Sequence, residues 1–121
     1  MIYVRDQVHT ALENALEGVC KVFHAYPAKG AALPAVSYYE AAHGEHASTA
    51  DGEYLTEINY QIDVYAASVR ETDEIGEKIN DAMAAFGFAR AFSYDVPDAE
   101  LRHKTMRYRG IIDPRYFVAK N

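Results

Sequence analysis

The feature that most constrains the fold is a run of alternating residues between positions 54 and 66. One set of alternate positions is mostly apolar or aromatic, and the set between them is polar or charged. The first set is Tyr54, Thr56, Ile58, Tyr60, Ile62, Val64 and Ala66, and the second is Glu57, Asn59, Gln61 and Asp63. A period of two predicts a strand with one buried and one wet face. Such a strand is typical of an antiparallel sheet covered by helices on one side only.

Two other stretches show the spacing of amphipathic helices. Apolar residues recur every three or four positions from Val4 to Val19, which predicts a helix ending near Gly18. A second helix is predicted to begin at Ser68 and Glu71, which form a capping box, and to end at Gly87. Its predicted buried stripe consists of Ile75, Ile79, Ala82, Met83 and Phe86.

The remaining apolar runs predict further strands, and their order defines the fold class. These runs cover residues 20–26, 35–40, 88–95 and 101–113, with a possible short edge piece at 116–118. The order helix, strand, strand, strand, helix, strand, strand predicts an α+β fold. We expect a four- to five-stranded, mainly antiparallel sheet with both helices on one face. Residues 1–121 are expected to form a single domain, with a long mobile hairpin loop at about 41–52.

Composition excludes several classes of protein. The chain has 121 residues, one cysteine and a formal net charge of -6. One cysteine forms no internal disulfide, and the net negative charge, with no segment that stands out as a basic arm, disfavours nucleic-acid binding. No apolar run approaches the about 20 residues that cross a bilayer, and the N-terminus lacks the pattern of a signal peptide. We therefore expect a soluble intracellular product with no membrane or specific nucleic-acid partner.

No grouping of residues indicates catalysis. A metal ion has candidate ligands in His43, Glu45, His46 and Asp51, but their spacing matches no established motif, and a solvated loop is the simpler interpretation. Cys20 follows the first helix, where a buried inert thiol is expected. No glycine-flanked serine or phosphate-binding loop is present. The sequence therefore predicts no catalytic residues, no cofactor and no metal, and hence no enzyme.

Charge along the last predicted strand offers a candidate interaction surface. Positive side chains gather there, while Glu57 and Asp63 lie on the wet face of the alternating strand. The positive residues are Arg102, His103, Lys104, Arg107 and Arg109. These charges can form cross-strand salt bridges within one subunit, or they can match charges on a neighbouring subunit and fix its register. Both interpretations stay open, and DNA contact is a weaker third.

The second half of the chain carries an ordered series of motifs. They are residues 58–66 (INYQIDVYA), 82–90 (AMAAFGFAR), 94–98 (YDVPD) and 103–113 (HKTMRYRGIID). This series resembles the small tail-completion or head–tail joining proteins of long-tailed phages and prophages. Residues 22–27 (VFHAYP) and 33–38 (LPAVSY) also look like the first hairpin of that family. The resemblance thus covers nearly the whole chain.

The resemblance implies a structural virion-assembly protein rather than an enzyme. It implies a ring, typically hexameric, at the tail terminus or the head–tail junction, assembled from subunits that are monomeric beforehand. Its expected partners are copies of itself, the tail-tube protein and the head-completion or connector proteins. Its expected location is the host bacterial cytoplasm and then the virion. The sequence alone leaves one alternative, a small ligand-binding or regulatory domain that dimerises through its sheet.

Overall fold

The structure, a computed structural model, describes residues 4–27, 30–48, 54–98, 100–113 and 118–120. Two helices and six strands follow one another along the chain. They are α1 (Arg5–Ala15), β1 (Lys21–His24), β2 (Ala35–Ser48), β3 (Tyr54–Ala66), α2 (Val69–Phe86), β4 (Ala89–Val96), β5 (Arg102–Asp113) and β6 (Val118–Lys120).

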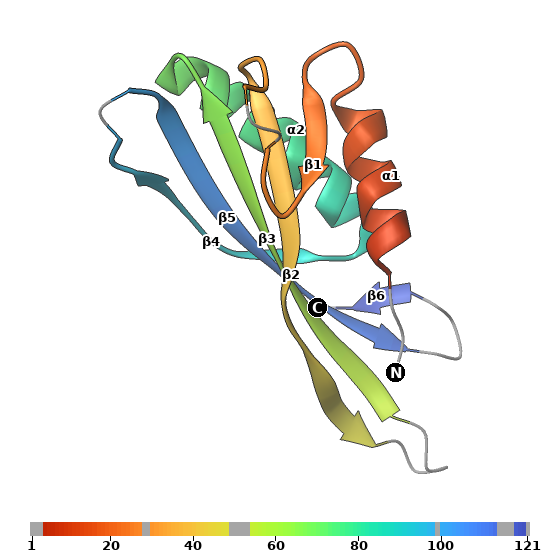
Figure 1. The fold of residues 1–121 in the computed structure, drawn as a ribbon. Helices are drawn as coiled ribbons and strands as arrows, with labels where there is room; N and C mark the ends of the chain where they lie inside the picture. Colours follow the sequence, from red (N-terminus) through yellow and green to blue (C-terminus); the bar gives the residue numbers. More distant parts are fainter. Residues whose placement is uncertain (1–3, 28–29, 49–53, 99, 114–117, 121) are drawn as a thin grey trace.

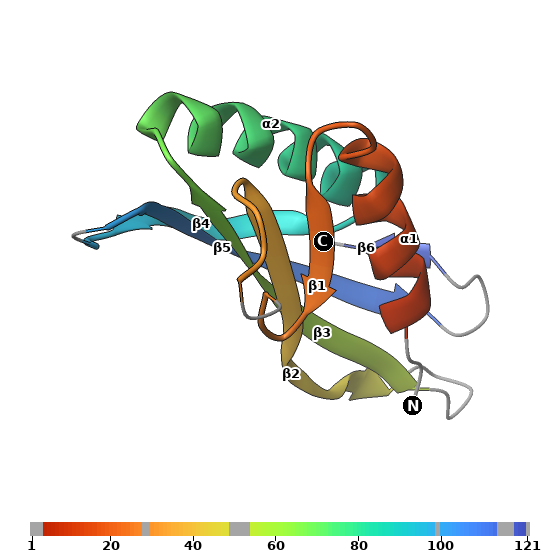
Figure 2. The same ribbon diagram turned by 45° about the horizontal axis from the view of Figure 1, so that its top comes forward.

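All six strands belong to one sheet. Its main order is β1-β2-β3-β5-β4, and β6 pairs with the end of β5. Among the strands that the structure describes, only β1 and β2 pair in parallel, and the other neighbouring strands are antiparallel. Both helices lie on the same face of this sheet (Figures 1 and 2). The predicted α+β class, with a mainly antiparallel sheet and two helices on one face, is confirmed.

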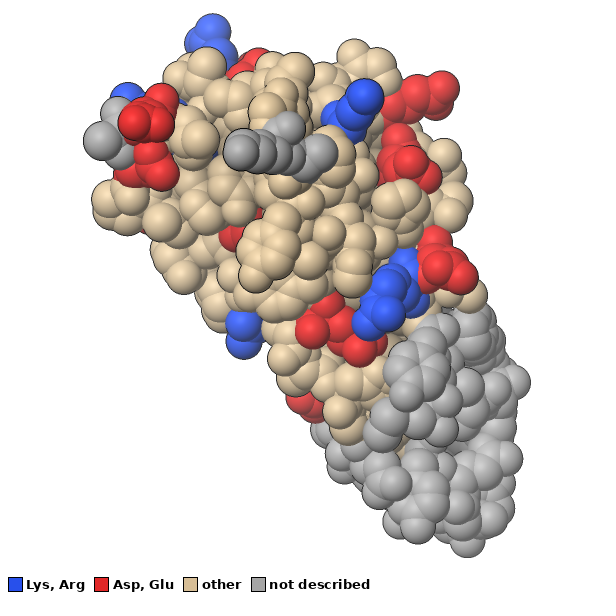
Figure 3. Space-filling model, viewed as in Figure 1, with Lys and Arg blue, Asp and Glu red and all other residues tan. Residues whose placement is uncertain are grey.

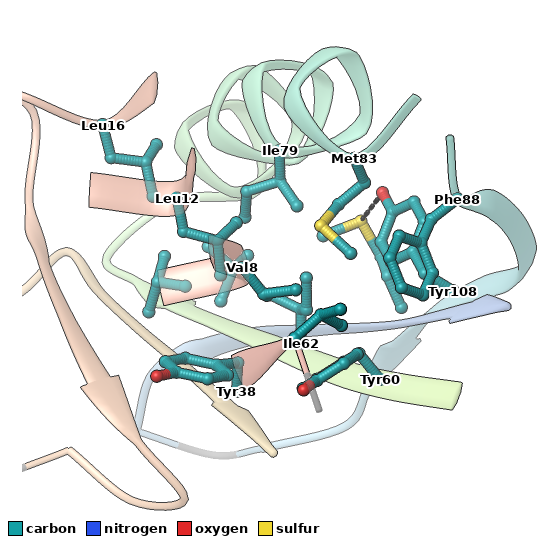
Figure 4. Close-up of a cluster of buried hydrophobic side chains, with 14 of the residues drawn as sticks. Val8, Leu12, Leu16, Tyr38, Tyr60, Ile62, Ile79, Met83, Phe88 and Tyr108 are labelled. Atoms are coloured by element: carbon teal, nitrogen blue, oxygen red, sulfur yellow. Dashed lines mark hydrogen bonds between the residues drawn. The ribbon is translucent and has the colours of Figure 1, made fainter. Parts of the chain in front are cut away.

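The core fills the space between the helices and this face of the sheet (Figure 4). It contains apolar side chains from α1 and α2 and the inward set of the strands. Its largest fully buried side chains include Leu12, Leu16, Ile58, Tyr60, Ile62, Ile75, Ile79, Met83, Phe88, Met106 and Tyr108. Burying one such side chain contributes about 1.5–3 kcal/mol. The alternation along β3 therefore favours a strand, and it also decides which face of that strand packs against the helices.

Helix α2 has the ends that the sequence predicts. The Ser68 side chain accepts a hydrogen bond from the Glu71 backbone N–H at 3.2 Å, and the Glu71 carboxylate accepts one from the Ala67 N–H at 3.4 Å. At the other end, Gly87 adopts a left-handed conformation with φ of 99°. These contacts satisfy groups that have no partner inside the helix, and they fix where α2 begins and ends.

The expectation of a first hairpin is wrong. Residues of β1 pair with β2 in parallel, from Lys21 opposite Ala35 to His24 opposite Tyr38. Because β1 and β2 run in the same direction, the first residue of β2, Ala35, lies beside the first residue of β1, Lys21. Alternation assigns side chains to faces but says nothing about strand direction, which depends on the path of the connection between the two strands.

The expected loop at 41–52 is also corrected. Strand β2 continues to Ser48, where it pairs with Tyr54 of β3. Two register shifts, between Glu40 and Ala42 and between Glu45 and Ala47, interrupt the pairing. Small polar residues have weak strand propensity, but pairing with β3 overrides it. Residues 49–52 lie outside the described part of the chain. The expected edge piece at 116–118 is described only from Val118, where β6 begins.

Candidate functional site

The face of the sheet opposite the helices carries the candidate site, and we call it the open face. It is defined by alternate residues of the three strands β3, β5 and β4, which project away from the core. These residues are Glu57, Gln61, Asp63, Tyr65, Phe92, Tyr94, His103, Thr105, Arg107 and Arg109. Figure 3 looks onto this face, where residues other than Lys, Arg, Asp and Glu occupy most of the centre. Neither helix covers it (Figure 2).

Two arginines on the open face are held by partners in the same chain. Arg109 donates to the Glu57 carboxylate at 2.6 Å, and Arg107 donates to the Gln61 amide oxygen at 2.8 Å. The Arg107 guanidinium carbon also lies 5.4 Å from the centre of the Phe92 ring, a cation–π distance. The predicted sharing of one face by Arg107 and Arg109 is confirmed, and cross-strand pairing within one subunit is observed for Arg109.

A second polar group lies further along the same two strands. His103 Nε2 is 2.8 Å from Asp63 Oδ1, and the His103 ring stacks on Tyr65 with centroids 4.4 Å apart. Asp63 is only 6% exposed, so its place on the wet face does not leave it in open solvent. Burial, reinforced by the nearby Asp63 carboxylate, raises the pKa of Tyr65. The Tyr65 hydroxyl therefore stays protonated across the physiological range.

Two predicted residues of the last strand lie elsewhere. The Lys104 side chain points to the helix side and bridges Asp73 at 3.1 Å and Asp95 at 3.3 Å. Burial would lower the Lys104 pKa, but the hydrogen bonds to these carboxylates outweigh it and the pKa is raised. Arg102 is exposed and donates to the backbone carbonyls of Asp98 and Leu101. The structure therefore divides the predicted positive surface between the two faces.

Of the four candidate metal ligands in the β2–β3 hairpin, only His43 has a side chain in the described part of the structure. His43 Nδ1 lies 3.1 Å from Glu40, which also pairs with Arg5 at 3.6 Å. The side chains of Glu45 and His46, and all of Asp51, lie outside the described part of the chain. Among the side chains that the structure does describe, no three His, Cys, Asp or Glu residues are placed to share a metal ion.

The sequence prediction missed two aromatic residues of β4. Phe92 and Tyr94 are 40% and 55% exposed, and their rings stack with centroids 5.7 Å apart. The signal was present, since aromatics at alternate positions share one face of a strand. Such a pair is more often part of a core, so alternation alone does not indicate that it is exposed. Cys20, by contrast, is partly buried as expected; burial, with a smaller effect of Glu71, raises the pKa of its thiol.

Comparison with known protein families decides the class of this protein. The family described as tail completion protein gp17 matches residues 6–113. The chain belongs to this family. Its role is therefore structural, in completing the tail of a bacteriophage virion. A search of curated proteins gives no match. None of the described helices is long and apolar enough to span a membrane.

Proposed function

We propose that the protein completes the phage tail by forming a closed ring at the tail terminus or the head–tail junction. The ring would be hexameric, as the resemblance to small tail-completion proteins implies. The observation that carries this proposal is the open face, a sheet surface left without a helix layer in a chain that belongs to a tail-completion family. A surface of this kind is suited to contact with other protein subunits.

The second support is the far half of the β2–β3 hairpin. It extends beyond the layer of helices and projects from the rest of the molecule (Figure 1). Pairs such as Gly44 with Glu57 and Glu45 with Thr56 continue the ladder into this projection. A projecting hairpin can reach a neighbouring subunit, so we assign it, with His43, Glu45, His46 and Asp51, to the interface.

The proposed interface combines this hairpin with the charged residues of β3 and β5. On the open face it includes Glu57, Asp63, Arg107 and Arg109. It also includes the exposed Arg102 and, on the helix side of β5, Lys104. Their pairing within one chain does not oppose this role. Side chains already held in place lose little conformational entropy when a neighbour binds, and charged pairs at a rim fix the register of subunits.

We infer that copies of the chain bind one another, the tail-tube protein and the head-completion or connector proteins. They would be monomers in the host cytoplasm and would enter the virion during assembly. Such binding requires no covalent reaction. The proposed protein is therefore not an enzyme and has no cofactor. A closed ring requires heterologous contacts, in which one surface of a subunit meets a different surface of the next.

Electron microscopy of particles that lack this protein tests the proposal. If the ring terminates the tail, its loss should give over-long tails; if it joins head and tail, filled heads should separate from tails of normal length. Normal joined particles would overturn the proposal. A chain in which Asn-Gly replaces residues 47–54 tests the hairpin. It should fold but fail to complement the deletion, and full complementation would remove the tip of the hairpin, including Asp51, from the interface.

A further inference from the structure

Exposed apolar side chains gather at two places in the described part of the chain. Six large apolar or aromatic side chains are exposed there: Val19, Tyr26, Leu33, Val69, Phe92 and Tyr94. Phe92 and Tyr94 lie on β4, which is one edge of the main strand order, while Val19 and Leu33 lie beside β1 at the opposite edge. Exposed apolar groups concentrated in this way mark sites of protein contact.

The β4 edge presents a projecting aromatic pair. Phe92 pairs with Arg107 and Tyr94 with Thr105, so both rings lie on the open face. Nearly all of β4 is exposed, from Arg90 to Asp95. The strand contains no proline or lysine, and the register shift between Arg90 and Phe92 precedes the aromatic pair, so the edge from Phe92 onward remains able to meet another chain. Beyond Asp95, which pairs with Lys104, the carboxylates of Asp98 and Glu100 follow the pair in the sequence.

The β1 edge presents a cleft instead. It has a volume of about 690 Å³, within the range of small ligand pockets, and apolar side chains predominate in its lining. The large apolar residues around it are Val19, Phe23, Leu33 and Pro34. Lys21, which is exposed, also lines the cleft and supplies a positive charge.

The two places lie on the same face and in the same row of the sheet. Pairing runs without interruption from Phe23 through Ser37, Asp63 and Thr105 to Tyr94. Phe23 in the cleft and Tyr94 in the aromatic pair are thus the two ends of one cross-strand row. A second copy placed beside the first, with the same face outward, would bring its Tyr94 next to the cleft of its neighbour.

We propose that the aromatic pair of one copy docks into the cleft beside β1 of the next copy. The proposal rests on the ring proposed above and names its contact. It joins two different patches at opposite edges, as a closed ring requires. Apolar rings would leave water for an apolar cleft, and the carboxylates near β4 would face Lys21. In this arrangement β4 runs antiparallel to β1, because β1 and β5 point the same way and β4 is antiparallel to β5.

Cysteine cross-linking in assembled particles tests the contact. In a Cys20→Ser background, particles would carry Tyr94→Cys, Leu33→Cys or both, and would be oxidised before denaturing electrophoresis. The double variant should give a ladder that extends beyond dimers, while each single variant should stay monomeric. The matched control replaces Tyr94→Cys by Lys78→Cys on the exposed side of α2 and should give no ladder.

Other outcomes of the cross-linking overturn the docking. Dimers from Tyr94→Cys alone would mean that two β4 edges meet symmetrically. A double variant that cross-links no more than the control would also overturn the docking. The proposed tail-completion role would remain if the formation of joined particles still required the protein. That role fails separately, through normal particles in the deletion strain.

A competition experiment tests the contact without altered β4 residues. Leu33→Asp and wild-type protein, produced together, would compete for places in particles, and mass spectrometry would measure the incorporated ratio. A charge in the cleft should lower incorporation about tenfold or more, the scale of losing one good apolar contact. Val69→Asp, at a similarly exposed position on α2, should incorporate normally. Equal incorporation of folded Leu33→Asp would overturn the proposal.

Discussion

Gly110 on β5 lies directly against the ring of Phe88, which occupies the space that a side chain at position 110 would need. A Cβ atom at position 110 would lie 2.5 Å from Phe88 Cε1 and 2.6 Å from Cδ1. Phe88 is fully buried and cannot move aside without disturbing its neighbours. We expect Gly110→Ala to lower the free energy of unfolding by about 1–3 kcal/mol, as overpacking of a core does. Urea denaturation measures the difference.

Gly44 on β2 provides the matched control for this substitution. It also lies in a strand, but a Cβ atom there would meet nothing within 4 Å. Gly44→Ala should leave stability unchanged or raise it slightly, because glycine weakens the interior of a strand. If both variants were as stable as the wild type, the packing of Phe88 against Gly110 would be looser than the structure shows.

Tyr108 links stability to alkaline pH. Its hydroxyl donates to Asn80 Oδ1 at 3.3 Å, and burial raises the pKa of Tyr108 to about 12. In the unfolded chain a tyrosine titrates near pH 10, so the unfolded state loses this proton first. Because the pKa is higher in the folded state, the contribution of Tyr108 to the free energy of unfolding is complete below about pH 10 and is lost as the pH rises toward 12.

Tyr108→Phe should therefore show a shallower loss of stability than the wild type between about pH 10 and 12. Urea unfolding at several pH values across this range gives the two slopes. Tyr26→Phe removes a hydroxyl from a ring that is 81% exposed and should keep the wild-type slope. Parallel slopes for Tyr108→Phe and the wild type would contradict the assigned role of Tyr108.

At the level of secondary structure, the start of α2 depends on one serine. Ser68 supplies the side-chain oxygen that accepts from the Glu71 N–H. Ser68→Ala should lower the free energy of unfolding by about 1 kcal/mol, while Ser68→Asp should retain most of it because a carboxylate also accepts this bond. Thermal or urea unfolding separates the two variants. Equal stability of all three proteins would show that packing alone fixes this end of the helix.

The elements that the sequence predicted well are those whose signals are local. Alternation in β3 and the cap at Ser68 act within a few residues, so they can be recognised before the fold is known. The parallel pairing of β1 and the continuation of β2 to Ser48 depend on what lies alongside them in space. Small residues such as Gly44 give no local indication of a strand. They adopt strand conformation because they pair with β3.

For the candidate site, too, the sequence predicts the local pattern but not the partners of each side chain. Alternation placed Arg107 and Arg109 on one face, but the register between β3 and β5 decides that Arg109 meets Glu57 and that His103 meets Asp63. A shift of register would exchange these partners, and sequence periodicity does not fix it. Lys104 alternates with His103 and so points to the helix side, where it meets Asp73, a partner that periodicity along β5 cannot indicate.

At the scale of the whole molecule, the two faces of the sheet have different roles. The helix side contains the large buried side chains and accounts for most of the stability. On the open face, partners such as Glu57 and Arg109 hold one another at the surface, and aromatic rings remain exposed at the β4 edge. Substitutions on the open face should therefore separate assembly from folding, which substitutions in the core cannot do.

Exchange of the charges of Glu57 and Arg109 tests this separation. Arg109→Glu removes a pair whose side chains are 40% and 31% exposed, and it should lower stability by at most about 1 kcal/mol. The exchange Glu57→Arg with Arg109→Glu restores an internal pair and with it the stability. If a neighbouring subunit contacts this pair, the exchanged chain should still give far fewer infectious particles, because both charges then face unchanged partners. The matched control exchanges the charges of Glu74 and Lys78 on α2 and should affect neither stability nor particle yield. Full yield from the exchanged Glu57 and Arg109 chain would mean that this pair acts only within one subunit.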